Sequence, residues 1–330
     1  MRSIDNRWRL GRLMQRTADL ASHFLRATEA AAIAAAAWRG RGDGKLADGA
    51  AVEAMRNVFD TIPFDGRVAI GEGERDDAPM LWIGEPLGSM QGDAAALSID
   101  IAVDPLECTN HVAKDSPNAI AVLAAAPRGT LLHAPDCYMD KLAGPAALKG
   151  EVSLEADVAY NVEAAAAALD KEPRELLAVV MDRDRHLDLI RDLRAEDVRI
   201  RLIGDGDVAG ALDAADPSSE VDLLIGVGAA PEGVITATAL RGLDAHFEGR
   251  LVFKNEGHRE RAEQMIDGDI ERIWSRDDLC QSDDALFIAS GVCTGYLPGV
   301  ECFGERVSVH SEIIDVASGD RRYISSEHDI

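Results

Sequence analysis

The chain has 330 residues, of which 47% are hydrophobic, and this is enough to bury the core of one large or two medium domains. Its 59 acidic and 34 basic side chains give a formal net charge of -25, so long-range repulsion argues against nucleic acid or an anionic membrane surface as a partner. Five cysteines without C-x-x-C spacing argue against a disulfide framework or a zinc site and favour a reducing cytoplasm. The apolar run at residues 30–38 is shorter than a membrane span, so we expect a soluble protein that is not exported.

The first seventy residues are predicted to form helices followed by a strand. Apolar residues recur every three or four positions over residues 10–38, which predicts one long helix or two. After a Gly-rich loop, residues 50–59 show a second helical pattern. Residues 67–70 read as a strand that ends at Gly71, so the acidic segment that follows lies at a strand terminus.

The middle of the chain is rich in strand patterns. Residues 98–103 are predicted to form a strand that Asp104 and Pro105 stop, because proline cannot continue a central strand. A hairpin is expected between residues 119–124 and 130–132, around Pro127.

Strands and helices alternate from about residue 161 onward. The predicted strands are 177–181, 199–203, 223–227 and 251–253, and the helices include 187–194 and 234–247. This alternation predicts an α/β protein with a mostly parallel sheet in its second half. We place a boundary between two domains near residues 155–160, which gives residues 1–157 and residues 158–330.

Five short acidic segments join carboxylates to glycine or proline. They are ADG at 47–49, GEGE at 71–74, VDPLECT at 103–109, GDGD at 204–207 and APEG at 230–233. Each lies at the expected end of a strand or start of a helix, where side chains can converge on one cavity. The pattern predicts a carboxylate cage for hard divalent cations, which prefer oxygen ligands.

The segment around Asp104 carries the most chemistry. Asp100 and Asp104 are an even number of residues apart and share a face of an extended strand, and we expect Pro105 to turn Glu107 back toward Asp104. The hydroxyl of Thr109 then faces the same point. Mg²⁺ or Mn²⁺ would compensate the repulsion between the two carboxylates, whereas the alternative is a turn that carries two surface acids.

Two further segments offer groups that can hold a phosphorylated sugar. Arg183 and Arg185 follow the strand at 177–181, so their guanidinium groups can hold a phosphate that is not cleaved; alternatively, they form a basic cluster at a helix entry, paired with neighbouring aspartates. The GDGD segment can accept hydrogen bonds from sugar hydroxyls, or it is an ordinary turn with a helix-capping aspartate. Tyr138 can stack on the sugar, and Lys141 can add positive charge near a phosphate.

The motifs resemble a known family. The core D-P-L-E-C-T is similar to the metal-binding motif of the lithium-sensitive, magnesium-dependent phosphatase superfamily. Six strings resemble, in order, the class II bacterial fructose-1,6-bisphosphatases: RGDGKLADGAAVEAMR, IGEGERDDAPMLWIGE, DIAVDPLECTN, HAPDCYMDKLAGP, IGDGDVAGA and GAAPEG. The resemblance implies a layered α-β-α-β-α sugar-phosphatase fold with two subdomains, a metal-binding catalytic half and a substrate-binding half. It also implies hydrolysis of fructose 1,6-bisphosphate in gluconeogenesis.

The resemblance also implies residue roles. Metal ligands for two or three Mg²⁺ or Mn²⁺ ions fall on Asp48, Glu72, Asp104, Glu107 and Glu232. Thr109, together with Asp48, is implied to orient the attacking water. Substrate contacts fall on Glu107, Cys108, Thr109, Tyr138, Arg183, Asp184, Arg185, Asp205, Gly206, Asp207 and Ala229. We expect Glu74, Asp76 and Asp100 to lie behind the ligands, and Glu74 and Asp76 are alternatively ligands of a third, weaker cation.

Two departures from the family pattern bear on substrate preference. Cys108 and Ala229 each replace a glycine of the family, and we expect altered affinity or substrate choice rather than loss of activity. Sedoheptulose 1,7-bisphosphate, alone or as a second substrate, is the close alternative. Two other classes are a catalytically silent sugar-phosphate sensor and a purely structural acidic protein. The resemblance implies a homo-oligomer, a dimer or a tetramer.

Overall fold

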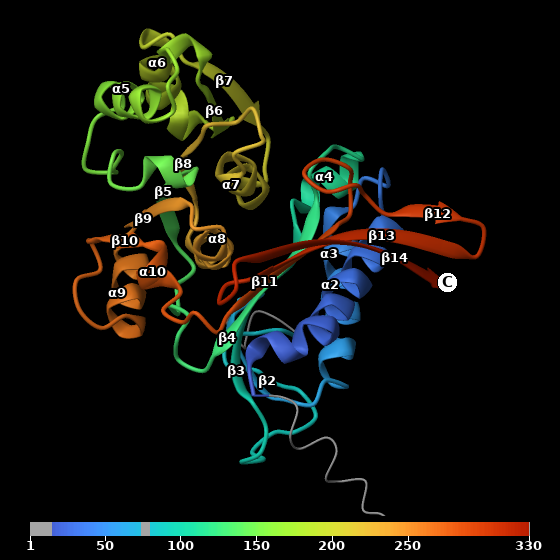
Figure 1. Cartoon of the computed structure of the whole chain (residues 1–330). Coiled ribbons are helices and arrows are strands. Elements are labelled where there is room, and N and C mark those ends of the chain that lie inside the picture. Colours follow the sequence, from blue (N-terminus) through green and yellow to red (C-terminus); the bar gives the residue numbers. More distant parts are fainter. Residues whose placement is uncertain (1–14, 74–79, 330) are drawn as a thin grey trace, which may run out of the picture.

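The computed structural model of the chain describes residues 15–73 and 80–329. Figure 1 shows two β-sheets with helices outside and between them. One helix pair covers the outer face of the first sheet, a second pair lies between the sheets, and a third covers the outer face of the second sheet. This order confirms the expected α-β-α-β-α layering. The three pairs are α2 (Ala21–Ala36) with α3 (Gly44–Phe59), α7 (Asp207–Ala215) with α8 (Ala230–Gly242), and α5 (Val158–Ala168) with α6 (Leu187–Ala195).

The first sheet has eight strands from both ends of the chain. Its strands are β1 (Asp65–Ile70), β2 (Pro86–Leu87), β3 (Ser98–Glu107), β4 (Ile120–Pro127), β11 (Leu286–Gly291), β12 (Glu301–Phe303), β13 (Arg306–Asp315) and β14 (Asp320–Asp329). The order is β12-β13-β11-β4-β3-β1-β2, and β14 pairs with β13. The C-terminal strands therefore complete the sheet that the N-terminal strands begin. The predicted division into two domains, residues 1–157 and residues 158–330, stays a prediction.

The second sheet has six strands in the order β10-β9-β5-β8-β6-β7. They are β5 (Tyr138–Gly144), β6 (Leu177–Met181), β7 (Arg199–Ile203), β8 (Leu223–Ala229), β9 (His246–Val252) and β10 (Ile273–Ser275). Only β6 pairs in parallel, with β7 and β8, whereas the β8–β5, β5–β9 and β9–β10 pairs are antiparallel. The prediction of a mostly parallel sheet was wrong. Helix α8 ends at Gly242, before the predicted residue 247, and the chain turns at Asp244 (φ 53°) into β9 beside β5.

The N-terminal helices differ from the prediction at their starts. A 3₁₀ turn (Thr17–Leu20) precedes α2, and residues 10–14 lie outside the described residues. Helix α3 begins at Gly44, before the predicted residue 50, because the Asp43 carboxylate accepts a hydrogen bond from the Leu46 N–H at 3.0 Å and caps the helix. Asp48 therefore lies on a helix rather than in a loop.

Two predictions about strands β3 and β4 were also wrong. Strand β3 continues through Pro105 to Glu107, with a register shift against β4 between Asp104 and Glu107. The predicted hairpin does not form, because β4 pairs on one side with β3 and on the other with β11, while Leu131 only bridges to Cys280. Buried on both faces, the alanine-rich β4 is a central strand.

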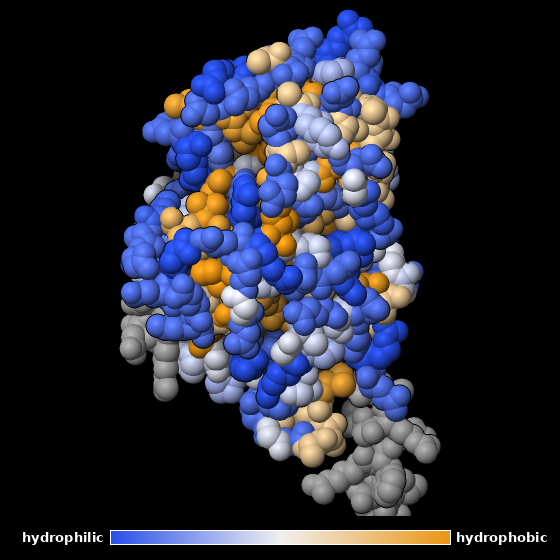
Figure 2. All heavy atoms as spheres, turned by 90° about the vertical axis from the view of Figure 1, so that its left-hand side faces the viewer, coloured by the Kyte–Doolittle hydropathy of each residue, from blue (hydrophilic) through white to orange (hydrophobic). Residues whose placement is uncertain are grey.

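Three further helices lie between strands: α4 (Thr109–Lys114) joins β3 to β4, α9 (Glu256–Met265) joins β9 to β10, and α10 (Arg276–Leu279) leads from β10 in the second sheet to β11 in the first. Figure 2 shows that the face on the left of Figure 1 is mostly hydrophilic, in keeping with 28% charged residues, with hydrophobic residues between the polar ones. Within the described ranges, no helix combines the length and the apolar character needed to cross a membrane.

Candidate active site

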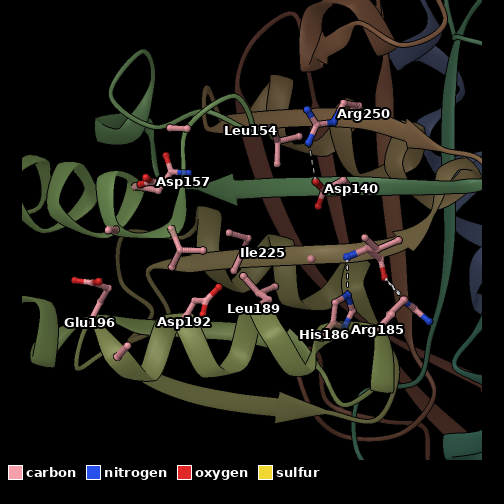
Figure 3. A pocket seen from close by; sticks show the side chains of 17 residues that line it. Asp140, Leu154, Asp157, Arg185, His186, Leu189, Asp192, Glu196, Ile225 and Arg250 are labelled. Atoms are coloured by element: carbon pink, nitrogen blue, oxygen red, sulfur yellow. Dashed lines mark hydrogen bonds and ion pairs between the residues drawn. The ribbon is translucent and has the colours of Figure 1, made fainter.

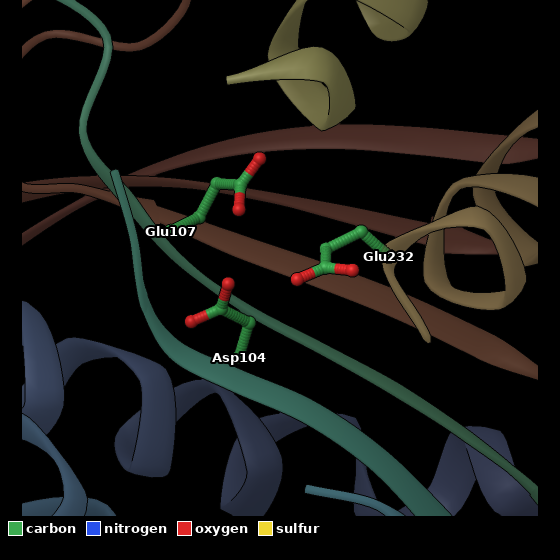
Figure 4. A group of neighbouring side chains, drawn as sticks. All are labelled: Asp104, Glu107 and Glu232. Atoms are coloured by element: carbon green, nitrogen blue, oxygen red, sulfur yellow. The ribbon is translucent and has the colours of Figure 1, made fainter. Parts of the chain in front are cut away.

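Three carboxylates from distant parts of the chain meet between the two sheets. Asp104 and Glu107 come from β3, and Glu232 comes from the first turn of α8. One oxygen from each side chain lies within 4.8 Å of the others. Figure 4 shows the three groups pointing toward a common point. Glu232 is well placed for negative charge, since the amino end of a helix carries a partial positive charge.

A β-bulge brings Asp104 and Glu107 to the same side of β3. Asp104 pairs with Val122 and Glu107 with Ile120, so β3 contains one residue more than β4 over this stretch. Residues three apart on a regular strand point to opposite faces, and the extra residue returns Glu107 to the face of Asp104. The predicted convergence is therefore found, although a bulge produces it rather than a broken strand.

Asp48 and Glu72 add negative charge to the same site. Glu72 follows β1 and lines a cavity of about 230 Å³ together with Asp104 and Glu232. Asp48 lies near enough that its charge raises the pKa of both Glu72 and Asp104. The structure thus brings together all five acids that the resemblance implies as ligands.

Burial raises the pKa of every acid in this cluster, and the charges of neighbouring acids raise it further for each of them except Asp48. Burial, then the charges of Asp104, Asp48 and Glu232, raise the pKa of Glu72 to about 8. Burial and the charge of Asp104 raise the pKa of Glu232 to about 7, although Lys141 opposes this shift.

Asp104 and Glu107 interact directly. Burial raises the pKa of Asp104 to about 6 even though a hydrogen bond from Glu107 lowers it. The pKa of Glu107 lies well above its usual value, mainly because of burial and then the charge of Asp104.

The donor set fits hard divalent cations. Among the described residues, Glu232 Oε2 is buried and has no hydrogen-bond partner. Asp104 keeps one oxygen for the site, since the other accepts a hydrogen bond from the Leu106 N–H at 3.0 Å. Oxygen atoms from several carboxylates are the ligands that Mg²⁺ and Mn²⁺ prefer. A cation placed here would relieve the repulsion that raises the pKa values.

We expect the metal-free protein to lose stability as the pH rises from about 4 to about 8. The pKa values of Asp104, Glu232 and Glu72 lie near 6, 7 and 8, above their unfolded values, so the folded state binds protons that the unfolded chain releases. The resulting stabilisation is complete below pH 4 and disappears as the pH rises through these folded values. Melting temperatures with chelator should fall between pH 6 and pH 8, and Mn²⁺ should remove the fall. An identical pH dependence with and without Mn²⁺ would contradict the shared cation site.

A second cavity, of about 200 Å³, adjoins the carboxylates. Its lining residues are Glu107, Tyr138, Met181, Arg183, Arg185, Asp205, Asp207, Gly228, Ala229 and Glu232. Glu107 and Glu232 belong to both the acidic cluster and this cavity. One part of the cavity wall is therefore acidic, and Arg183 and Arg185 lie elsewhere on it. A molecule with a phosphate at each end can contact the acidic cluster with one phosphate and the arginines with the other.

Backbone contacts hold Arg185 at this cavity. Its Nε and Nη2 donate hydrogen bonds to the Val227 carbonyl oxygen at 3.0 and 2.7 Å. His186 Nδ1 donates to the Met181 carbonyl and its Nε2 accepts from the Val227 N–H, both at 2.8 Å. Figure 3 shows the contacts of Arg185 and His186 with Val227 along the wall of another cavity, of about 580 Å³, on the other side of Arg185. That cavity lies between the second sheet and helices α5 and α6, away from the carboxylate cluster.

Sequence reasoning missed Lys254. Its Nζ lies 3.6 Å from the centre of the Tyr138 ring, and the guanidinium carbon of Arg185 lies 5.2 Å from it. Three cationic side chains thus gather near Tyr138, including Arg183 on the cavity wall. The sequence did offer a signal: Lys254 follows the strand that ends at Val252 by two residues, and a basic side chain at a strand end is notable in so acidic a chain.

Lys141 has a different place from the one expected. It is buried, and its ammonium group donates to Asp207 Oδ2 at 2.6 Å. Gly228 makes room for this pair, because a Cβ at that position would lie 1.8 Å from Asp207 Oδ2. The suggestion that Lys141 adds charge for a phosphate is corrected: Asp207 already neutralises it, and together they brace the loop beside the cavity.

The family described as bacterial fructose-1,6-bisphosphatase, glpX-encoded, matches residues 18–328. The chain belongs to this family. A class 2 fructose 1,6-bisphosphatase/sedoheptulose 1,7-bisphosphatase of Synechococcus sp. (strain JA-3-3Ab) is 44% identical, over 94% of this chain and 95% of that protein. Proteins of the same description from Acaryochloris marina and Synechocystis sp. are 42% and 40% identical, over 92% and 94% of this chain and 94% and 96% of theirs.

In this class II fructose-1,6-bisphosphatase, Cys108 occupies a left-handed backbone conformation. Its φ is 77° and its ψ is 53°, a region that glycine enters without steric cost. Cys108 is buried, and burial followed by the charge of Glu107 raises the pKa of its thiol well above the usual range. The backbone thus explains why glycine suits this position, and the neutral thiol packs against the loop that carries Gly206.

Gly206 and Cys108 should be coupled in stability. Gly206 has a φ of 93°, and a Cβ there would lie 2.9 Å from Cys108 Sγ. We expect Gly206→Ala to lower the free energy of unfolding by about 2 kcal/mol, from backbone strain and this contact. In a Cys108→Gly background the loss should be about 1 kcal/mol smaller, as a double-mutant cycle by denaturant unfolding would show. Equal losses in the two backgrounds would mean that the loops do not touch.

Several expected site residues lie elsewhere. Asp184 is exposed and does not line the substrate cavity. Asp100 is buried and forms a bidentate pair with Arg67 at 2.9 and 2.8 Å, and it also accepts from the Gly129 N–H. Despite burial, hydrogen bonds from His133 and Arg67 lower the pKa of Asp100 to about 2. No contact links Asp100 to the described ligand acids, which corrects its expected place behind them, and Glu74 and Asp76 lie outside the described residues.

Proposed function

We propose that this enzyme hydrolyses fructose 1,6-bisphosphate to fructose 6-phosphate and phosphate, as a step of gluconeogenesis in the cytoplasm. The observation that carries the proposal is the acidic cluster of Asp104, Glu107 and Glu232 beside a cavity with Arg183 and Arg185 on its wall. Such a site can accept one phosphate for cleavage and hold the other. Sugar bisphosphates are therefore favoured over monophosphates.

The five clustered acids would hold two or three Mg²⁺ or Mn²⁺ ions. Bound cations would neutralise the oxygens of the cleaved phosphate, lower the pKa of a coordinated water and stabilise the leaving alkoxide. Asp48 comes from α3, Glu72 follows the end of β1, Asp104 and Glu107 lie on β3, which runs parallel to β1 beside it, and Glu232 comes from the first turn of α8. Rigid elements thus fix the donors before substrate arrives.

Thr109 would orient the attacking water. It is the first residue of α4, two positions after Glu107, and its backbone touches the start of α3, the helix of Asp48. A hydroxyl between two carboxylates can accept a hydrogen bond from water and donate one to an acid. With Asp48 as the second partner, the water is aligned with the scissile bond.

The rest of the substrate would contact the second sheet. Arg183 and Arg185 hold the 6-phosphate by charge-assisted hydrogen bonds, and Tyr138 packs against the sugar. Asp205 accepts hydrogen bonds from sugar hydroxyls. Asp207 is already paired with Lys141 and acts mainly by holding the loop in place.

Sedoheptulose 1,7-bisphosphate is the second candidate substrate, because relatives 40% to 44% identical are named for both activities. Purified enzyme should release phosphate from fructose 1,6-bisphosphate with Mg²⁺ or Mn²⁺, and chelator should stop it. Parallel assays with sedoheptulose 1,7-bisphosphate and fructose 6-phosphate rank the substrates. Thermal stabilisation by these sugars without phosphate release would identify a silent sensor and refute the proposal.

We expect the protein to act without nucleic acid or membrane partners and as a homo-oligomer, a dimer or a tetramer. The net charge of -25 supports the first expectation.

A further inference from the structure

Lys254 lies on the short connection between a strand and a helix beside the substrate cavity. Strand β9 ends at Val252, which pairs with Tyr138 of β5. Immediately after Lys254, the Asn255 side chain caps helix α9. Both ends of the connection are therefore fixed, and they hold the Lys254 backbone next to Tyr138, which lines the substrate cavity.

Two cations approach the Tyr138 ring from different strands. Strand β5 lies between β8 and β9, and Figure 3 shows Arg185 and Arg250 of β9 on opposite sides of this strand. Arg185 is bound to Val227 of β8, and its guanidinium carbon lies 5.2 Å from the ring centre. The Lys254 ammonium group, from the β9 side, lies 3.6 Å from it. Both distances allow a cation–π interaction, and Lys254 makes the closer contact.

The Lys254 ammonium group is available to bind an anion. The residue is exposed, and its side chain forms no ion pair and no hydrogen bond with any residue in the ranges 15–73 and 80–329. By contrast, three of the other five lysines, Lys141, Lys149 and Lys171, each pair with an aspartate. An ammonium group held by a ring alone can move to a phosphate without breaking an ion pair.

Arg185 and Lys254 differ in how firmly they are held. Two hydrogen bonds to the Val227 carbonyl oxygen, at 3.0 and 2.7 Å, fix the position and the plane of the Arg185 guanidinium group. Lys254 carries a compact charge on a flexible four-carbon stem, and no such bond to a described residue fixes it. Arg185 can therefore bind a phosphate at one place, whereas Lys254 can follow a phosphate whose place differs between substrates.

The two candidate substrates differ in the place of the phosphate that is not cleaved. Fructose 1,6-bisphosphate carries it on the sixth carbon and sedoheptulose 1,7-bisphosphate on the seventh, one carbon further from the cleaved phosphate. Because the acidic cluster fixes the cleaved end, this difference arises at the far end, where the cations lie. A flexible cation suits the longer sugar better than a fixed one.

We propose that Lys254 sets the preference of the enzyme between these two sugars. Its ammonium group leaves the Tyr138 ring and binds the phosphate that is not cleaved, and it contributes more to sedoheptulose 1,7-bisphosphate than to fructose 1,6-bisphosphate. This inference rests on the proposed function, since it assigns a role within the same site. The movement also uncovers the Tyr138 ring, which can then pack against the sugar.

Lys254→Met tests the preference, because methionine keeps an apolar stem but carries no charge. We expect kcat/KM to fall at least about 10-fold for sedoheptulose 1,7-bisphosphate, as for loss of a charge-assisted hydrogen bond, and about 3-fold or less for fructose 1,6-bisphosphate. Fructose 1-phosphate has no second phosphate and should react as with the wild type. An unchanged ratio of the two bisphosphate values, or an equal loss with fructose 1-phosphate, would overturn the inference.

Two further variants separate the position of the charge from its mere presence. Lys254→Arg restores a cation at the same place and should recover most of the loss for sedoheptulose 1,7-bisphosphate. Lys149→Met removes a lysine that pairs with Asp244 away from the substrate cavity, and it should leave both bisphosphate values unchanged. If Lys149→Met reproduces the effect of Lys254→Met, overall charge is responsible and the assignment of Lys254 is wrong.

Binding of the products separates this inference from the proposed function. Fructose 6-phosphate and sedoheptulose 7-phosphate keep only the far phosphate, and titration calorimetry with Mn²⁺ measures their dissociation constants without turnover. Lys254→Met should raise the constant of sedoheptulose 7-phosphate at least about 10-fold and that of fructose 6-phosphate less. If the wild type shows this difference but releases no phosphate, the proposed hydrolysis fails while the role of Lys254 stands. Equal changes for the two products, or no binding of either to the wild type, overturn the inference.

Discussion

Replacing Asp104 by asparagine should lower turnover more than about 100-fold while leaving the protein folded. Asp104 lies within 4.8 Å of both Glu107 and Glu232, and it raises the pKa of Glu72 by its charge, so it is central to the cation site. Asparagine keeps the shape but supplies no negative charge, and losing a principal electrostatic group typically costs this much. Phosphate release under saturating Mn²⁺ measures the loss. Near-normal turnover would refute the assignment of Asp104 as a ligand.

Asp100 supplies a matched control on the same strand. Asp100→Asn makes the same chemical change four residues earlier, where the carboxylate pairs with Arg67 instead of with other acids. We expect it to lower the free energy of unfolding by about 2 kcal/mol through weaker charged hydrogen bonds, with turnover within a few-fold of wild type. In metal-free protein, Asp104→Asn should instead raise the melting temperature, since it removes like-charge repulsion. Equal effects of the two changes on turnover would mean that neither is specific to the site.

Replacing Arg183 by alanine should lower kcat/KM for fructose 1,6-bisphosphate about 10-fold to 100-fold. A charge-assisted hydrogen bond to phosphate contributes about 1.5–3 kcal/mol, which corresponds to this range. Arg183 is the suitable arginine to change, because its one hydrogen-bond partner among the described residues is the adjacent Asp182 carbonyl at 3.1 Å, whereas Arg185 also supports Val227. Steady-state kinetics with fructose 1,6-bisphosphate and with fructose 1-phosphate measure the effect.

Only the bisphosphate should respond, because fructose 1-phosphate has no second phosphate for Arg183 to bind. Arg201→Ala is the control, since Arg201 is also an arginine of the second sheet but pairs with Glu220 on the surface. An equal loss with both substrates would show that Arg183 acts on the cleaved phosphate or on folding instead.

The sequence predicted which residues form the site better than it predicted how the backbone brings them together. Local patterns identified the acidic segments and the family, and both lead to Asp104, Glu107 and Glu232. The bulge in β3 was not predictable, because it depends on pairing with β4, which no local pattern encodes. Likewise, the partner of Lys141 depends on β5 and β8 lying side by side, which places the ammonium group against Asp207.

Long-range pairing also limited the prediction of the fold. The layers followed from the family resemblance, and the parallel β6–β7 and β6–β8 pairs agree with the alternating pattern. Strand β5 precedes that pattern along the chain and β9 follows it, and their antiparallel pairing is a tertiary choice that hydrophobic periodicity does not record. Lys254 was missed for the same reason, since its closeness to Tyr138 depends on the pairing of β5 with β9.

The position of β11 has a consequence for biosynthesis. Strand β4 lies in the middle of the first sheet, and its second neighbour, β11, leaves the ribosome only near the end of translation. Until then the nascent chain exposes an alanine-rich, apolar edge that is prone to aggregate. Chaperone capture of the growing polypeptide is therefore expected, and the polypeptide must be almost complete before β4 gains both neighbours and the cation site can reach its final rigidity.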